Sequence, residues 1–354
     1  MNAYIKGISI VSPQKIIGDQ ILPNDAPAHP DLGYMKCIEP AYREFIDPMV
    51  ARRMSRIVKM GVYCARKCMN DTGINMPDGI IAGTALGCLE DTEKFLSSIY
   101  TSEEKLLNPT PFIQSTHNTV AGAIALAVKC HGYNATYTQR GFSFENALQD
   151  ALMQLHEDPS KNILVGGFDE VTDTSLAITS RLGLWKNHPV EKDRLYEYKT
   201  RGSLAGEGAA FLMLNGKQKY TDEVSIKSLT CFYDGHVNDI NRKIAECLDR
   251  EGILSQKIDL VILGNNGDVR YDQYYHKLVS GIFNKSAVTG FKHLCGEYDT
   301  SASFAVWLAW YIMKHKKLNL LSLNDIPVPG EVNSVLIYNN LRGKYHSVYY
   351  LEKC

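Results

Sequence analysis

The sequence lacks the features that mark membrane-spanning and nucleic-acid-binding proteins. Its 354 residues carry a formal net charge of −1, and charged residues make up 22% of the chain. This near-balance gives no global reason to expect nucleic acid or an anionic membrane as a partner. No apolar run approaches the roughly 18 residues that a membrane-spanning helix needs. We therefore expect a protein that neither spans a membrane nor binds nucleic acid.

The sequence also lacks the usual signatures of metal sites, disulfide frameworks and export. Its nine cysteines are scattered and form no CxxC pair, and Cys64 and Cys68 lie four positions apart in a helical pattern. This usage is typical of reduced, buried thiols. No P-loop or HExxH pattern occurs, and residues 1–7 lack a charged segment followed by an apolar one. We predict a cytoplasmic protein that uses no metal and no cofactor.

Alternating strand-like and helix-like segments fill the chain, and 45% of its residues are hydrophobic. Residues 55–71 read as a helix, with Ser55 as its cap and Gly73 after its end. Residues 117–129 are so rich in alanine and valine that we expect a helix buried on most sides. Other predicted strands cover 79–84, 134–138, 161–165, 209–214, 224–230, 260–263, 332–338 and 347–351, and other predicted helices cover 144–155, 237–249, 274–282 and 300–313. The α/β alternation runs through two cycles that meet within 215–222.

Four segments, in this order, resemble the ketoacyl synthases of fatty acid and polyketide assembly. They are NPTPF at 108–112 with Asn118 and Ala121-Gly122 after it, VGGFDE at 165–170, RGSLAGEGAA at 201–210, and KHLCG at 292–296. The resemblance implies an α/β, thiolase-like fold of five layers, αβαβα, with two related halves that each hold a mixed five-stranded sheet. We place these halves at 1–217 and 218–354.

The family's catalytic cysteine sits at a strained strand-to-helix turn, which corresponds here to residues 138–147. Aligning Ala147 and the following helix with the family places Gly141 at the cysteine position, and glycine has no side chain to acylate. Ser143 is the nearest hydroxyl. It is either a replacement nucleophile, which would need a base against it, or a helix N-cap or first-turn polar residue. Gln139 would reach the position through a two-residue slip, and chain-length factors and some decarboxylating relatives carry glutamine there.

The family's two catalytic histidines have one direct counterpart in this sequence. His293 matches the second histidine, and it either polarises a carbonyl oxygen or only packs. Asn266 occupies the position of the first histidine, where an amide can donate to an oxyanion or can form an Asn-Gly turn. The family's glycine-rich C-terminal loop is replaced by NLRGKY at 340–345.

The resemblance implies a function in fatty acid or polyketide biosynthesis, with aryl-polyene or flexirubin-type pigment assembly as a specific candidate. The missing cysteine favours a chain-length-factor-like subunit, whose partners would be acyl carrier protein and an intact ketoacyl synthase, or a second copy of the chain. Whether the chain is an enzyme stays open, since it resembles a 3-oxoacyl-[acyl-carrier-protein] synthase without the nucleophile. The alternatives are a noncanonical condensing or decarboxylating enzyme, and a protein that only binds an acyl chain or its carrier.

Overall fold

The computed structural model describes residues 3–17, 20–22, 34–315 and 321–354. Its strands are β1 (Ala3–Val11), β2 (Lys15–Ile17), β3 (Gln20–Leu22), β4 (Tyr34–Met35), β5 (Gly79–Gly83), β6 (Tyr133–Tyr137), β7 (Asn162–Asp169), β8 (Ala205–Gly206), β9 (Gly208–Asn215), β10 (Val224–Tyr233), β11 (Leu260–Leu263), β12 (Ala287–Gly290), β13 (Ser334–Leu341) and β14 (Tyr345–Lys353). Its α-helices are α1 (Pro48–Ala51), α2 (Arg56–Thr72), α3 (Leu89–Thr101), α4 (Pro109–Gln114), α5 (Thr119–Val128), α6 (Ser143–Glu157), α7 (Asp173–Arg181), α8 (Ile240–Arg250), α9 (Val269–Ser280), α10 (Lys292–Cys295) and α11 (Ala302–His315). Short 3₁₀ helices are η1 (Tyr42–Glu44), η2 (Arg140–Phe142), η3 (Lys192–Glu197), η4 (Val237–Asp239) and η5 (Ser255–Lys257).

Ten of the described strands form one mixed sheet in the order β12-β11-β13-β14-β10-β1-β9-β7-β5-β6. Within it, β6, β5 and β7 are parallel, as are β12, β11 and β13, whereas the pairs between β7 and β13 are antiparallel. If the strands of each half are numbered in chain order, both halves have the same spatial order, 3-2-4-5-1. The halves join where β1 pairs with β10. The predicted α/β fold with two related halves is therefore confirmed.

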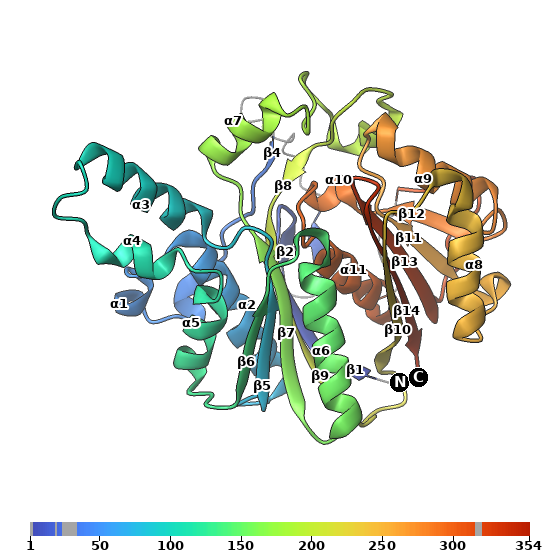
Figure 1. Cartoon of the computed structure of the whole chain (residues 1–354). Helices are drawn as coiled ribbons and strands as arrows, with labels where there is room; N and C mark the ends of the chain where they lie inside the picture. The colour runs from blue at the N-terminus through green and yellow to red at the C-terminus, as the bar shows by residue number, and fades with distance from the viewer. Residues whose placement is uncertain (1–2, 18–19, 23–33, 316–320) are drawn as a thin grey trace.

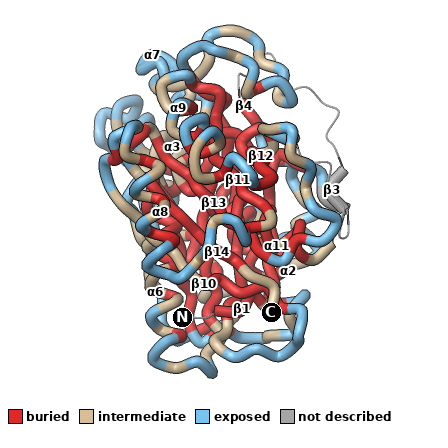
Figure 2. Tube along the Cα trace, turned by 90° about the vertical axis from the view of Figure 1, so that its right-hand side faces the viewer, coloured by how far each residue is buried: buried red, intermediate tan, exposed pale blue. Residues whose placement is uncertain are grey.

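Helices cover the sheet on its outer faces and also fill the space between its halves. In Figure 1, α6 and α11 lie between the two halves, α2 and α5 lie outside the first half, and α8 and α9 lie outside the second. The central core contains side chains of α6 and α11 together with strands of both halves. Two further cores lie under α2 and under α8 and α9. Figure 2 shows the strands and α11 as mostly buried and α8 as partly exposed.

Helices α2 and α5 can both be compared with the predictions made from the sequence. Ser55 occupies the N-cap position of α2, but its side chain makes no capping hydrogen bond. Gly73 follows the helix as predicted and is its left-handed C-cap, with φ of 70°. The prediction that the alanine-rich helix is buried on most sides is wrong. Only Val120, Ala121 and Ile124 of α5 are buried, and Leu126 is 83% exposed. The helix therefore carries apolar side chains that the described part of the chain does not fully cover.

The boundary proposed between the halves falls in the connection between β9 and β10. β9 ends at Asn215 and β10 begins at Val224, so the proposed division after residue 217 cuts no described strand.

Candidate functional site

The turn between β6 and α6 has one residue in the left-handed region of backbone space. That residue is Arg140, with φ of 50°, and Gly141 is not among the glycines with positive φ. Left-handed backbone costs a non-glycine residue about 1 kcal/mol. The strained position is therefore Arg140, one residue before the glycine aligned with the family's cysteine. Neither residue type carries a nucleophile.

Gly141 is buried beneath the hairpin formed by β13 and β14. A Cβ atom added at Gly141 would lie 2.9 Å from Leu341 Cδ2 and 2.9 Å from Tyr345 Cβ. The ring of Phe142 packs edge-on against Tyr345, with centroids 5.0 Å apart. A side chain at position 141 would therefore require the hairpin to move. The space above this position is filled by protein.

Ser143 and Gln139 hold the turn together. The Ser143 hydroxyl accepts a hydrogen bond from the backbone N–H of Gln139 at 2.8 Å, and Ser143 is fully buried. No imidazole or carboxylate of the described residues hydrogen-bonds to this hydroxyl. The Gln139 side chain lies on the exposed side of the turn and accepts from the Asn146 amide. Ser143 is therefore the first residue of α6 and not its N-cap, which is Phe142, and no base among the described residues contacts its hydroxyl.

Asn266 lies in the loop after β11, with its amide held in one orientation. Its Oδ1 accepts from the backbone N–H of Asp268 at 3.0 Å, so its Nδ2 is left to donate. The backbone N–H groups of Asn266 and Gly267 each donate to Asp272 at 3.0 Å. Burial raises the pKa of Asp272 to about 7. This loop therefore presents a fixed amide donor to the interior.

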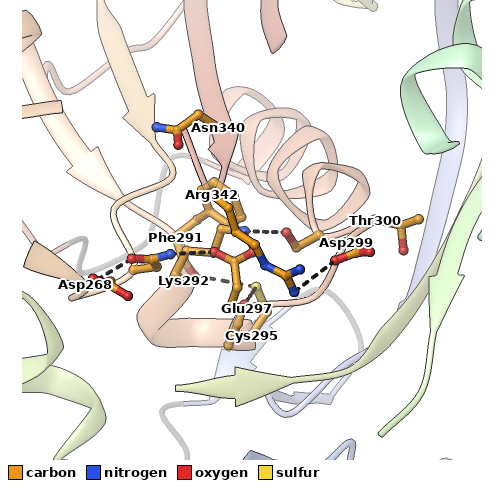
Figure 3. Close-up of polar contacts among 12 residues, drawn as sticks. Asp268, Phe291, Lys292, Cys295, Glu297, Asp299, Thr300, Asn340 and Arg342 are labelled. Atoms are coloured by element: carbon orange, nitrogen blue, oxygen red, sulfur yellow. Dashed lines mark hydrogen bonds and ion pairs between the residues drawn. The ribbon is translucent and has the colours of Figure 1, made fainter. Parts of the chain in front are cut away.

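The group that faces Asn266 is Glu297. Asn266 Nδ2 donates to Glu297 Oε2 at 2.8 Å, and Lys292 Nζ donates to Glu297 Oε1 at 2.6 Å. Lys292 Nζ also donates to the hydroxyl of Ser301. All four residues are at least 95% buried, and Figure 3 shows Lys292 and Glu297 side by side below the hairpin.

His293 points away from this network. Its Nδ1 lies 2.9 Å from the hydroxyl of Tyr196, which comes from η3. Burial lowers the pKa of His293 to about 4, and the charge of Lys192 adds to that effect. The imidazole is therefore neutral near pH 7. The structure does not bring His293 together with Asn266 or Ser143 through any hydrogen bond among described residues, and the geometry favours Glu297 as the partner of Asn266.

Sequence reasoning missed Lys292 and Glu297 as a pair. Two oppositely charged residues stand five positions apart between the apolar strand β12 and the apolar helix α11, and charges in such surroundings are rarely buried unless paired. That pattern was the available signal. It does not predict the contact with Asn266, which comes from a loop 31 positions away in sequence.

Two arginines and one aspartate close the outer side of the site. Asp299 lies 3.8 Å from Arg140 and 3.9 Å from Arg342, and Figure 3 shows Arg342 directed at Asp299. Three residues, 342–344, connect β13 to β14, and the first two of them, Arg342 and Gly343, have positive φ of 55° and 67°. Burial raises the pKa of Asp299, and the two arginines oppose that change. The hairpin and the turn at Arg140 are thus linked through one carboxylate.

The only cysteine in this cluster is not an activated thiol. Cys295 is fully buried, and its Sγ faces the carbonyl oxygens of Phe291 and Gly296. Burial raises its pKa well above the ordinary value, whereas a reactive cysteine needs a lowered one. Across the described residues no cluster of three or more potential metal ligands occurs. None of the described helices combines the length and the apolar character needed to span a bilayer.

Residues 27–179 match the model of the beta-ketoacyl synthase N-terminal domain. The matched residues make up less than half of the chain, and that part of the chain is similar to the beta-ketoacyl synthase family. No curated protein matches it, but many solved structures share its fold. The ishigamide ketosynthase/chain length factor superposes with a TM-score of 0.76 and 16% identity, covering 100% of this chain and 99% of that one.

Two further solved structures share the fold of this chain. A beta-ketoacyl synthase from Burkholderia phymatum gives a TM-score of 0.77 at 18% identity, covering 100% of this chain and 99% of that chain. The complex of the ketosynthase ApeO with its chain length factor ApeC, from Xenorhabdus doucetiae, gives 0.73 at 15% identity, covering 100% and 98%. At such identities the likeness establishes the fold, and function has to be argued from the site.

Proposed function

We propose that this chain is a chain-length-factor-like subunit that pairs with an active ketosynthase and is not acylated itself. The observation that carries the proposal is the packing at Gly141. The aligned nucleophile position has no side chain, and Leu341 and Tyr345 occupy the space a side chain would need. A covalent acyl intermediate at this position has neither an attacking atom nor room.

The surface beside the turn supports a protein partner. Its core is the edge strand β6, which among the described strands pairs with β5 alone and ends the sheet. Exposed apolar side chains lie on β6 itself, on α5, which contacts β6, and on α4, which precedes α5 in the chain: Tyr133, Leu126, Phe112 and Ile113. We call these four residues and β6 the edge face. An open edge strand with exposed apolar neighbours is a liability unless another chain covers it.

The family and its structural neighbours supply the chemistry of the partner. The neighbours include a ketosynthase in complex with its chain length factor and a type II polyketide synthase acyl-carrier protein in complex with its ketosynthase. By this analogy the partner of our chain is a ketosynthase that retains the cysteine, and the substrates arrive on acyl carrier protein. We place the complex in fatty acid or polyketide biosynthesis, with aryl-polyene or flexirubin-type assembly as the specific candidate. The nine free cysteines support a reducing compartment such as the cytoplasm.

The alternative of a decarboxylating or condensing enzyme has less support. Its candidate residues were His293, Asn266 and Ser143, with Gln139 as a substitute nucleophile. Asn266 already donates to Glu297, and a carboxylate beside a developing enolate would destabilise it. The other alternative is a protein that only binds an acyl chain or a carrier. Such a protein would be stable as a single chain, and its edge face would not be left exposed.

Intact-protein mass spectrometry tests the absence of acylation. The chain is incubated with acyl carrier protein that carries a range of acyl groups, alone and with a candidate partner ketosynthase that retains the catalytic cysteine. We expect no adduct on this chain and loading of the ketosynthase only when both chains are present. An adduct on this chain alone would refute the proposal and would make the protein an enzyme.

A matched pair of charge substitutions tests the edge face. Leu126→Asp puts a charge on the edge face, and Leu254→Asp makes the same change at a residue that is 59% exposed in the second half of the chain. A stable interface buries about 800 Å² on each partner and excludes unpaired charge from its centre. L126D should therefore weaken complex formation at least about tenfold in sedimentation or light-scattering titrations, whereas L254D should not. Equal effects of the two variants would place the interface elsewhere.

A further inference from the structure

The most unusual polar feature of the interior is a carboxylate held by donors that other contacts already fix. Lys292 Nζ is positioned by Ser301 and lies 4.8 Å from the ring centroid of Phe291. The amide of Asn266 is positioned by the backbone N–H of Asp268. These arrangements do not depend on Glu297. The donors should therefore keep their places when the Glu297 carboxylate is removed.

Each oxygen of that carboxylate has its own donor. Lys292 reaches Oε1 at 2.6 Å and Asn266 reaches Oε2 at 2.8 Å. One donor is charged, and both are buried, so the hydrogen bonds are of the strong, charge-assisted kind. A buried ammonium left without its anion would carry a large desolvation cost. A cation and an amide that grip the two oxygens of one carboxylate are what a carboxylate-binding pocket requires.

We infer that Lys292, Asn266 and Ser301 form a binding site for a small monocarboxylate, which the chain fills with its own Glu297. Glu297 acts as a tethered ligand that keeps the pocket closed to outside carboxylates. This inference concerns the interior of one chain and does not depend on the proposed heterodimer. Its failure and the failure of the proposed function are therefore separate outcomes.

The size of the missing side chain predicts which carboxylate will bind. Glu297→Ala removes a methylene and a carboxylate, which are the heavy atoms of acetate. Glu297→Gly removes one carbon more, which corresponds to propionate. The backbone around residue 297 remains tied to its neighbours, because its N–H donates to Leu204 and its carbonyl accepts from Gly206. The preferred ligand should therefore change from acetate to propionate between the two variants.

The experiment measures thermal unfolding midpoints in acetate, propionate and chloride at equal ionic strength. Samples are first refolded from urea in each salt, so that a buried site can be loaded. We expect the midpoint of E297A to rise by several degrees in acetate, with saturation, as ligand binding to the folded state requires. E297G should respond more to propionate than to acetate, and the natural chain should respond to neither.

Two controls make the result decisive. In E297A/K292M the ammonium is gone, so the acetate response should disappear. Glu297→Gln fills the pocket with an amide of the same shape, so it should also show no response. If E297A does not refold in chloride, its refolding yield in acetate replaces the midpoint, and a higher yield supports the inference. Equal midpoints or yields in acetate and chloride, an equal response of the natural chain, or a response that survives in E297A/K292M would overturn it.

Discussion

A buried carboxylate in the central helix layer makes the stability of this chain depend on pH in a direction that can be calculated. Glu145 lies in the first turn of α6 and is fully buried. Neither of its oxygens makes a hydrogen bond of normal geometry. Burial raises its pKa from the ordinary 4.5 to about 7, although the hydroxyls of Tyr349 and Ser347 and the charge of Lys292 oppose the change.

The sign and size of the effect follow from this shifted pKa. Below pH 4.5 Glu145 is protonated in both the folded and the unfolded chain and contributes no pH dependence. Between pH 4.5 and pH 7 the unfolded chain releases its proton first, so stability falls as pH rises. Each tenfold change in proton affinity corresponds to about 1.4 kcal/mol. Above pH 7 the ionisable side chain should therefore cost about 3 kcal/mol relative to its protonated form.

Glu145→Gln removes the ionisation while it keeps the size of the side chain. We expect the difference in unfolding free energy, E145Q minus the natural chain, to increase by about 2–3 kcal/mol between pH 5 and pH 8.5. Urea unfolding at both pH values measures it, and pH effects of other groups cancel in the difference. Glu157→Gln, at an exposed position of the same helix, is the matched control and should show little pH dependence. A difference for E145Q that stays constant with pH would refute the reasoning.

Three further changes test the site itself. Gly141→Ala should cost about 1–3 kcal/mol of stability because its Cβ meets Leu341 and Tyr345. Leu341→Ala in the same chain should recover part of that loss. If the losses of the two substitutions simply add, the packing argument is contradicted. The pKa of His293 is lowered to about 4, so its contribution to the free energy of unfolding is lost as pH falls from 6.5 to 4. In urea titrations, His293→Gln should therefore lose less unfolding free energy between pH 7 and pH 4.5 than the natural chain does. Arg342→Ala should lower the free energy of unfolding by less than about 1 kcal/mol, because its 3.9 Å ion pair with Asp299 is long and partly exposed. A larger loss would mean that the hairpin depends on this ion pair.

Much of the fold could be predicted from periodicity and from the family resemblance. Strand β11 (Leu260–Leu263) and helix α2 match the predicted segments within a residue, because a short apolar run and a capped amphipathic pattern are local signals. Strands β1 and β12 were not predicted. β12 spans only four residues and ends with Thr289 and Gly290, which is too short a pattern to stand out.

The errors lie where the answer depends on contacts between distant segments. The composition of α5 was taken as a sign of burial, but a face that a second chain would cover has the same composition as a buried one. His293 was chosen because it is a histidine in a family motif, whereas the residue that meets Asn266 is Glu297. The His293 side chain is held instead by Tyr196 of η3, which packs against α10. Sequence spacing alone does not contain that information.

The pairing of β1 with β10 also has a consequence for how the chain could be rearranged. Ala3 pairs with Ile226, and Leu351 pairs with the same residue from the other side, so the first and last strands are separated by one strand, about 10 Å. Figure 1 shows the start of β1 close to the C-terminal end of β14. A circular permutant opened between β9 and β10 and closed by a short linker between the present ends would keep every strand pair of the large sheet. The order in which the two halves are synthesised could thus be reversed without changing the sheet that they form.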